Sequence, residues 1–515
     1  VDECADASVR TGPTVCGPNS AGRKQQVCTA GSWVDNALCI DNDVCHNTDS
    51  RTLDCGTNLD GDLSQLCTGG QWANTTACLC RDNCYVDALT GSDTNGGASA
   101  SDAFKTIQTA LGKVSDDGTI HLAAGTLAEA GQIVIARDVT MIGAGAAATT
   151  ITPLQPTGTS GDARGWIHVE EGATFDLSNV TLDGTGYDVH SGILFSGSGS
   201  VTSSAILNMV HPGYAGRGVN LDQDSTQSID VEISGCVLEG FGRIGIYVGH
   251  GHAQIEDNDI IGKGDGDHLD YGVEVARGAS AHIIGNHLTD HRGVAAVDGS
   301  TSAALFVHSY FEPGGTSATI EDNVISGSAL ALAVGYLAGD SSLVTAHGND
   351  FGGLVGEQNG AGIDATTAAL VDASCNWWGS ASGPGAQGPG TGVSVSANVA
   401  FRPWLLSSDL NETCVAQAPT IAIVADDDHL QPGQVAQLTF TLSAPSTNFV
   451  SGDVAVVGGV LSSFAGSGVG YTATFTADGT SLTASVTVAA GAFSDAPGNL
   501  NLAATPVAIT VDECA

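Results

Sequence analysis

The stretch that decides the fold is ISGCVLEGFGRIGIYVGHGHAQIEDNDIIGKGDGDHLDYGVEVARGASAHIIGNHL, residues 233–288. One hexapeptide pattern occurs in it three times, as ISGCVL, IEDNDI and IIGNHL, with Asn or Cys at the fourth position among apolar residues. A second short apolar segment, GIYV or GVEV, separates the copies. A period of roughly 20–30 residues that contains two or three short strands is typical of a solenoid, in which each coil stacks on the one before it.

The pattern continues on both sides of this stretch, and its fourth positions are Asn179, Asn208, Cys236, Asn258, Asn286, Asn323, Asn349 and Asn376. We expect these residues at one corner of successive coils. Stacked asparagines there would form a ladder of side-chain amides, which satisfies polar groups that are costly to bury alone. Cys236 interrupts the series and is predicted to be a buried free thiol that serves packing.

Three segments resemble the right-handed parallel β-helix family, the pectate-lyase-like superfamily. They are YVDALTGSDTNGG with the following AFKTIQTAL, the recurring I-x-x-N-x-I, and CNWWGSASGPG at residues 375–385. The resemblance covers about residues 85–405 and implies a short capping helix within Phe104–Leu111, which protects the first coil from edge-to-edge strand pairing. It also implies that Trp377 and Trp378 close the far end. Cys375 and Cys414 are expected to form a disulfide there, so we place the β-helix domain at 85–414.

Residues 1–84 contain a duplicated unit, CGPNSAGRKQQVCTAGSWVDNALC (16–39) and CGTNLDGDLSQLCTGGQWANTTAC (55–78), with the same Cys and Trp spacing. Small modules of this cysteine density depend on disulfides, which indicates an oxidising, extracellular compartment; zinc is the competing interpretation. Trp33 and Trp72 are expected to pack over the bridges. Ten cysteines are predicted to pair among themselves: Cys4, Cys16, Cys28, Cys39, Cys45, Cys55, Cys67, Cys78, Cys80 and Cys84.

Residues 415–510 alternate apolar and polar positions between frequent turn residues, which predicts a β-sandwich. The segments LTFTLS, YTATFTA and GAFSDAPGN resemble bacterial Ig-like domains of surface adhesins. The predicted fold class is therefore all-β: a right-handed parallel β-helix with an N-terminal disulfide-rich domain and a C-terminal Ig-like β-sandwich. Residues 511–515, VDECA, repeat the first five residues. We expect them to begin a further repeat or to connect subunits, with Cys514 as the cysteine that joins repeats.

The net charge is −41, from 56 acidic and 15 basic residues. Such a charge repels nucleic acid and anionic membranes, and no apolar run is long enough for a transmembrane span. The chain begins without a signal-peptide pattern, so we expect a mature or excised, exported protein.

The acidity fits either a solvated acidic surface or Ca²⁺ held by Asp-rich turns. Within GKGDGDHLDYG, the metal candidates are Asp265, Asp267 and Asp270; the alternative is a solvated turn.

The candidate ligand-binding residues are Tyr247, Glu274, Phe306 and His308. Tyr247, Glu274 and Phe306 are expected to point outward from the second strand on successive coils. Tyr247 and Phe306 would stack on sugar rings, with His308 adjacent. The alternatives are contact with another subunit or packing under a loop. No catalytic residue is assigned, since GHG at 250–252 lacks its companion motifs.

We therefore predict an extracellular or cell-surface structural and adhesive protein, a repeating cassette or subunit of a fibre that associates head to tail and binds carbohydrate. A non-enzymatic role is favoured. The alternative is a calcium-dependent polysaccharide lyase or glycoside hydrolase with accessory modules.

Overall fold

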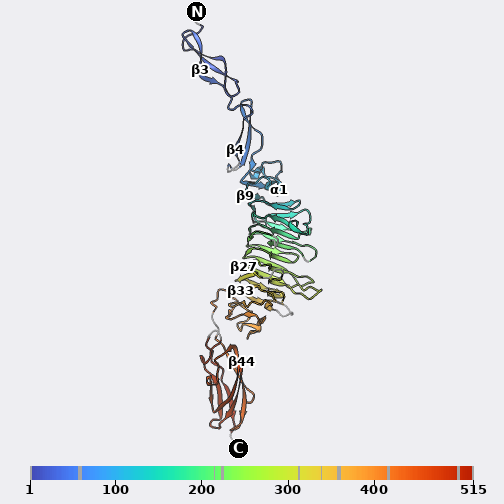
Figure 1. Cartoon of the computed structure of the whole chain (residues 1–515), viewed down its shortest axis with the longest axis vertical. Coiled ribbons are helices and arrows are strands. Elements are labelled where there is room, and N and C mark those ends of the chain that lie inside the picture. The colour runs from blue at the N-terminus through green and yellow to red at the C-terminus, as the bar shows by residue number, and fades with distance from the viewer. Residues whose placement is uncertain are drawn as a thin grey trace. The chain divides into compact units, whose positions relative to one another are not determined.

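The structure is a computed structural model that describes residues 3–55, 59, 61–213, 215–221, 225–310, 314–337, 339–355, 361–414, 418–495 and 499–512 (Figure 1). The chain divides into two compact units, Val1–Ala318 and Thr319–Ala515. Within the described residues, the helices are short: α1 (Ile107–Leu111) and the 3₁₀ helices η1 (Ala100–Asp102), η2 (Gly161–Arg164) and η3 (Ser451–Asp453). No helix in this part of the chain has the length and hydropathy of a membrane span.

Three parallel sheets make up the central part of the chain, and from β9 to β35 each turn of the chain adds one strand to each sheet in the same order. Sheet I, in spatial order, is β39 (Val399–Ala400), β36 (Val371–Asp372), β33 (Leu343–His347), β30 (Ser317–Glu321), β27 (Ser280–Ile284), β24 (His252–Glu256), β21 (Asp230–Ser234), β18 (Ser198–Thr202), β15 (Thr174–Ser178), β12 (Val139–Gly143), β9 (Gly118–Leu122) and β8 (Asn83–Val86). Sheet II is β10 (Gly125–Glu129), β13 (Thr149–Pro153), β16 (Thr181–Asp183), β19 (Ala205–Leu207), β22 (Val237–Glu239), β25 (Asp259–Gly264), β28 (His287–His291), β31 (Val324–Ser326) and β34 (Asp350–Gly353). Sheet III is β11 (Ile133–Ile135), β14 (Gly165–Val169), β17 (Ser191–Phe195), β20 (Arg217–Leu221), β23 (Ile244–Val248), β26 (Tyr271–Val275), β29 (Ala303–Val307), β32 (Leu330–Val334), β35 (Ala361–Ala365), β38 (Gly392–Val395) and β37 (Pro384–Ala386).

This arrangement is a parallel β-helix, and it confirms the predicted fold class. Sheet I shows why the sequence folds this way: Met141 pairs in register with Ile120 on one side and Leu177 on the other, and all three side chains are fully buried. Stacking one coil on the next therefore places apolar side chains in continuous interior rows. At the first coil, α1 buries Ile107, whose backbone N–H donates to the buried Glu129 carboxylate at 2.8 Å.

The amide ladder is present, but it begins later than the sequence spacing suggested. Asn258 and Asn286 are buried in one unit and Asn323, Asn349 and Asn376 in the other. The Cys236 backbone N–H donates to Asn258 Oδ1 at 2.9 Å, so Cys236 does belong to the row.

Asn179 and Asn208 do not belong to this ladder. The Val180 backbone N–H donates to Ser204 Oγ at 3.3 Å, so Ser204 occupies the position that Asn208 was expected to hold. Asn179 and Asn208 instead adopt φ of 60°, a left-handed conformation that asparagine tolerates at turns.

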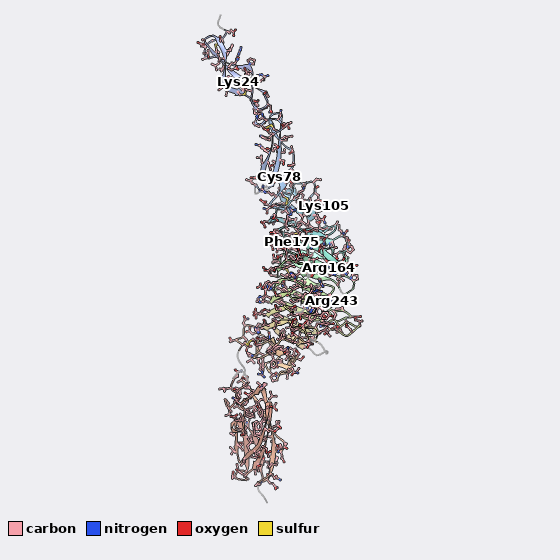
Figure 2. All side chains as sticks on the ribbon, in the orientation of Figure 1. Lys24, Cys78, Lys105, Arg164, Phe175 and Arg243 are labelled. Atoms are coloured by element: carbon pink, nitrogen blue, oxygen red, sulfur yellow. A yellow bond between two sulfur atoms is a disulfide. The ribbon has the colours of Figure 1, made fainter. Side chains whose placement is uncertain are left out.

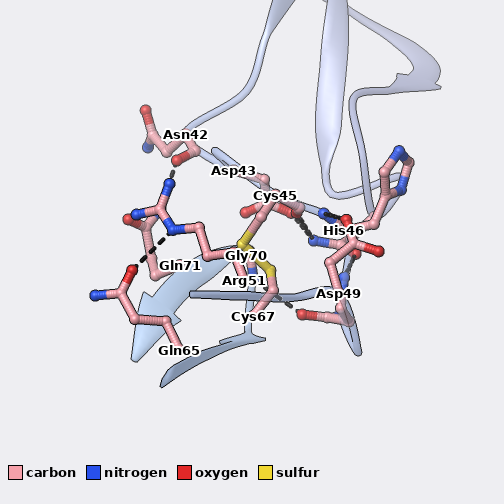
Figure 3. Close-up of a disulfide and its surroundings, with 12 residues drawn as sticks. Asn42, Asp43, Cys45, His46, Asp49, Arg51, Gln65, Cys67, Gly70 and Gln71 are labelled. Carbon is pink, nitrogen blue, oxygen red and sulfur yellow. Dashed lines mark hydrogen bonds between the residues drawn. A yellow bond between two sulfur atoms is a disulfide. The ribbon is translucent and has the colours of Figure 1, made fainter. Parts of the chain in front are cut away.

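The N-terminal segment contains two small antiparallel modules with the same disulfide pattern. Their strands are β1 (Val9–Cys16), β2 (Gly22–Thr29) and β3 (Ser32–Ile40), then β4 (Ser50–Cys55), β5 (Gly61–Thr68), β6 (Gln71–Asn74) and β7 (Leu79–Cys80). The disulfides are Cys4–Cys28 and Cys16–Cys39 in the first module, Cys45–Cys67 and Cys55–Cys78 in the second, and then Cys80–Cys84. Figure 3 shows the Cys45–Cys67 bridge.

The C-terminal part is a sandwich of two sheets. One is β40 (Ile421–Ala425), β42 (Val435–Ser446) and β44 (Gly459–Ala477); the other is β41 (His429–Leu430), β46 (Val507–Val511), β45 (Thr483–Val488) and β43 (Val454–Val457). Its core contains Phe440, Phe449, Phe475 and Phe493. Before it, a disulfide joins Cys375 to Cys414, and Trp378 is fully buried near the end of the coils.

Candidate functional site

A row of basic side chains follows the corner at which the strands of sheet III begin. Gly165, Ser191, Arg217 and Ile244 are paired in register on successive coils. Arg164, His190 and Arg243 each precede this register position by one residue, and Arg217 occupies it. Because neighbouring strands lie about 4.8 Å apart, the coils present basic groups at regular intervals. We call Arg164, His190, Arg217 and Arg243 the arginine row; Figure 2 labels Arg164 and Arg243.

Glycines beside the row allow the coils to pack closely. Gly218 and Gly245 follow the row residues at the same register, and a Cβ on either would lie 2.6 Å from the carbonyl oxygen of the glycine on the next coil. A side chain there would push the coils apart, so glycine is required. This is the physical reason for the glycine in the GIYV and GVEV segments.

The row concentrates positive charge in a chain whose net charge is −41. Burial lowers the pKa of His190 to about 4, and the charges of Arg217 and Arg164 contribute to this shift. His190 is therefore neutral at pH 7, with its ring 5.3 Å from that of His211. Burial also lowers the pKa of Arg217, which nevertheless stays charged because arginine starts far above neutrality.

Aromatic rings hold two of the arginines in place. The Arg217 Cζ lies 3.9 Å from the centroid of the Tyr247 ring, and the Arg243 Cζ lies 5.8 Å from that of Tyr271. Arg217 Nη1 also donates to Asn220 Oδ1 at 3.2 Å. Among the described residues, the buried Nε of Arg243 has no hydrogen-bond partner.

The predicted ligand-binding residues lie under the row instead of on an open surface. Tyr247, Glu274 and Phe306 are paired in register as expected, but Tyr247 is 2% exposed, Glu274 6% and His308 2%. The Phe306 ring stacks on His308 at 4.4 Å between centroids, and His308 Nε2 lies 3.2 Å from Glu274 Oε1. The expected exposure does not hold for Tyr247, Glu274 and His308, which are buried, with Arg217 over the Tyr247 ring, whereas Phe306 is half-buried.

The predicted metal candidates do not converge on one point. Asp265 pairs with Arg292 at 3.3 Å, and Asp267 accepts a hydrogen bond from the Ala296 backbone at 2.8 Å. Asp270 is fully buried, and its Oδ2 accepts from the Lys263 backbone N–H at 2.8 Å. Within the residues described here, no group of three or more His, Cys, Asp or Glu residues is arranged to hold a metal ion. The structure does not bring Asp265, Asp267 and Asp270 together in the shared metal site that the sequence predicted. Burial turns Asp270 inward, away from the other two.

Asp270 faces His291 instead, with 3.5 Å between its Oδ1 and His291 Nδ1. Burial raises the pKa of Asp270, but the hydrogen bond and charge of His291 and the Lys263 N–H together hold that pKa below its ordinary value. The Asp270 carboxylate thus lies against an imidazole inside the β-helix.

Two cysteines stand apart from the disulfides in different ways. Cys236 is a buried free thiol, with Sγ donating to the Val201 carbonyl at 3.3 Å. Burial raises the pKa of Cys236 to about 11, so it is not a reactive nucleophile at neutral pH. Cys514, the predicted link between repeats, lies outside the described residues.

Sequence reasoning missed the arginine row, although a signal for it was present. An Arg or His stands one or two residues before the glycine of the second strand in RGWI, HSGIL, RGVNL and RIGIYV. These occurrences are separated by a full coil, so they look unrelated until the register aligns them.

Comparison with known proteins gives a family match for the C-terminal residues and weak structural likenesses. No curated protein sequence matches the chain. A solved structure of a mutant of the PL6-family alginate lyase AlyGC is similar at 10% identity and a TM-score of 0.25, over 61% of this chain and 42% of that one. The chain thus spans less than half the length of that protein. The six disulfides of the described residues are consistent with an extracellular or surface location. Residues 415–511 match the family model of the bacterial Ig-like domain, Big_12.

Proposed function

We propose that this protein is an extracellular structural and adhesive module of a cell-surface assembly, and that its β-helix binds an acidic polysaccharide along the arginine row. The observation that carries the proposal is the regular placement of Arg164, His190, Arg217 and Arg243 on successive coils. A polysaccharide with one carboxylate per sugar also presents its charges at regular intervals. The three arginines of the row, with neutral His190 on the coil between Arg164 and Arg217, are complementary to such a polymer.

The chemistry of the row suits carboxylates. Arginine binds a carboxylate through two parallel N–H donors, and an aromatic ring beneath the guanidinium limits its motion before binding. Arg217 over Tyr247 has this arrangement. Neutral His190 offers a hydrogen-bond donor or acceptor to a sugar hydroxyl without adding repulsion between cations.

The strong negative charge elsewhere limits binding to the row. A polyanion is repelled by a chain that carries 56 acidic and 15 basic residues, so attraction is local and depends on ionic strength. The predicted Ca²⁺ would act in this setting by bridging acidic sugars to acidic side chains. The adhesive role is supported by the disulfide modules and by the Ig-like domain, which together with the β-helix form a chain of small stable domains.

Binding of polygalacturonate and alginate, with dextran as the neutral control, tests the proposal by calorimetry at low and physiological salt. Arg217→Gln and Arg243→Gln are each expected to weaken binding about tenfold or more, because a hydrogen bond to a charged group contributes roughly 1.5–3 kcal/mol. Lys105→Gln removes the same charge from an exposed β-helix position outside the row and is expected to have no effect. Equal affinity in all three variants, or equal binding of dextran, would show that the row is not the site.

The same samples test the alternative function and the metal. If the protein is a lyase, ultraviolet absorbance of unsaturated sugar ends rises with time, and a hydrolase releases reducing ends. We expect neither. Chelation with EDTA shows whether Ca²⁺ contributes: binding that survives chelation is carried by the row alone.

A further inference from the structure

Two arginines in the N-terminal modules are held by the same set of contacts. The Cζ of Arg10 lies 4.4 Å from the centroid of the Trp33 ring, and that of Arg51 lies 4.2 Å from the Trp72 ring. The Nε of each donates to a glutamine, Arg10 to Gln26 Oε1 at 2.9 Å and Arg51 to Gln65 Oε1 at 2.8 Å. Figure 3 shows the second of these bonds.

The chain of hydrogen bonds extends one residue further in both modules. Gln26 Nε2 donates to Asp35 Oδ1 at 2.8 Å, and Gln65 Nε2 donates to Asn74 Oδ1 at 2.7 Å. A hydrogen bond from Thr14 lowers the pKa of Asp35, so that its carboxylate stays ionised. Each glutamine amide is thereby fixed with its oxygen toward the arginine.

These contacts hold exposed side chains that gain little for folding. Arg10 and Arg51 are both exposed, and ordering a long side chain at the surface costs conformational entropy. A guanidinium already fixed by an aromatic ring and an Nε bond loses less freedom when it binds a carboxylate. Arg10 and Trp33 lie on one face of the sheet in the first module, and Arg51 and Trp72 lie on the corresponding face of the second. We call these four residues the arginine–tryptophan face.

A surface with complementary charge lies at one end of the Ig-like sandwich. No lysine or arginine follows Arg402 in the sequence. Asp426, Asp427 and Asp428 are exposed in one turn, and the Thr510 N–H donates to the Asp428 carbonyl at 2.8 Å, which places this turn beside the end of β46.

A small hollow adjoins this turn. It has a volume of about 110 Å³ and is lined by residues that include Pro432, Leu482 and Asp512. Leu482 is 61% exposed. The Asp512 N–H donates to the Leu430 carbonyl at 2.9 Å, which ties this side of the hollow to the aspartate turn. We call Asp426, Asp427, Asp428, Asp512 and Leu482 the acidic end.

We propose that the arginine–tryptophan face of one copy binds the acidic end of the sandwich of a second copy. Each partner offers what the other needs: guanidinium groups fixed over tryptophan rings meet carboxylates in a domain that contains no lysine or arginine. Electrostatic complementarity of this kind determines which surfaces associate and in which order. The contact does not depend on the arginine row or on any carbohydrate.

Sedimentation velocity of the whole chain over a range of concentrations, at low and high NaCl, tests this proposal. A Cys514→Ser background removes any covalent link through that residue. We expect reversible association at low salt that high salt weakens. The charge reversals Arg10→Glu with Arg51→Glu are expected to weaken association at least about tenfold, as are Asp427→Lys with Asp428→Lys.

Mixing the two reversed proteins is expected to restore association, because the native acidic end of the Arg10 and Arg51 variant meets the native arginine–tryptophan face of the Asp427 and Asp428 variant. A single chain that carries all four reversals is expected to associate again, since its two surfaces are complementary with signs exchanged. Lys105→Glu is the matched control and is expected to associate as the parent does. Circular dichroism melting verifies that each variant is folded.

A chain that stays monomeric at every concentration in low salt would overturn the proposal. Association that is unchanged by the paired reversals would do so as well. Polygalacturonate binding is expected to be unaltered in the Arg10 and Arg51 variants, so failure here is distinguishable from failure of the carbohydrate proposal.

Discussion

Replacing Asn286 by alanine is expected to destabilise the β-helix by about 4 kcal/mol. Asn286 is fully buried, and its Nδ2 donates to the carbonyls of Ile255 at 2.9 Å and Ile284 at 3.0 Å. Its Oδ1 accepts from the backbone N–H and the side-chain Nδ2 of Asn258, at 3.0 and 2.9 Å. Alanine leaves these four groups without their partner in a place that water does not reach. At roughly 0.5–1.5 kcal/mol for each bond, the loss is about 2–6 kcal/mol.

Calorimetry measures this effect as a fall in Tm. Since 1 kcal/mol corresponds to roughly 2–4 °C for a cooperative unit of 150–250 residues, we expect a fall of about 8–16 °C. Hydrogen exchange of peptides from residues 230–290 locates the loss within the ladder.

The matched control is Asn208→Gly. Asn208 lies outside the ladder, is exposed, and has φ of 60°, which glycine adopts without strain. Its Nδ2 donates to Asp183 Oδ1 and Thr185 Oγ1, both at 2.9 Å, but these bonds are exposed to water, so the loss is expected to stay below about 1.5 kcal/mol. If Asn286→Ala costs no more than Asn208→Gly, the ladder does not stabilise the stack and the reasoning fails.

Three further predictions concern groups with shifted pKa. Because the pKa of Cys236 is raised to about 11 and the thiol is buried, it is expected to react with a thiol reagent at pH 8 only after unfolding; fast labelling of the native protein would contradict this. Since the pKa of His190 is about 4 in the folded chain and 6.5 when unfolded, stability is expected to fall as pH drops from 6.5 towards 4, and His190→Gln should flatten that part of the pH–Tm curve. Burial raises the pKa of Glu129 above 4.5, so the native protein is expected to lose stability as pH rises from 4.5 through the folded pKa. Glu129→Gln retains an acceptor for the Ile107 N–H and should show no such loss in the same pH titration of Tm.

The sequence by itself determined the type of fold and much of the covalent framework. The spacing of IEDNDI and IIGNHL predicted stacked coils, because the alternation of inward and outward side chains along a strand is a local property. The duplicated cysteine spacing indicated two small modules for the same reason: the loops that the bridges close are short, 22 to 24 residues apart in sequence.

Only the tertiary structure decided which residues form the surface of the site. Tyr247 was correctly placed in register but was expected to be exposed, and the side chain that covers it, Arg217, comes from the preceding coil. Arg164 and Arg243 are 79 residues apart in sequence, and only the register of parallel strands brings them into one row. Asp270 turned inward although Asp265 and Asp267 stay exposed. Pattern along one strand fixes the face to which a side chain points, whereas coverage and clustering depend on the lengths of the loops between coils, and these vary from one coil to the next.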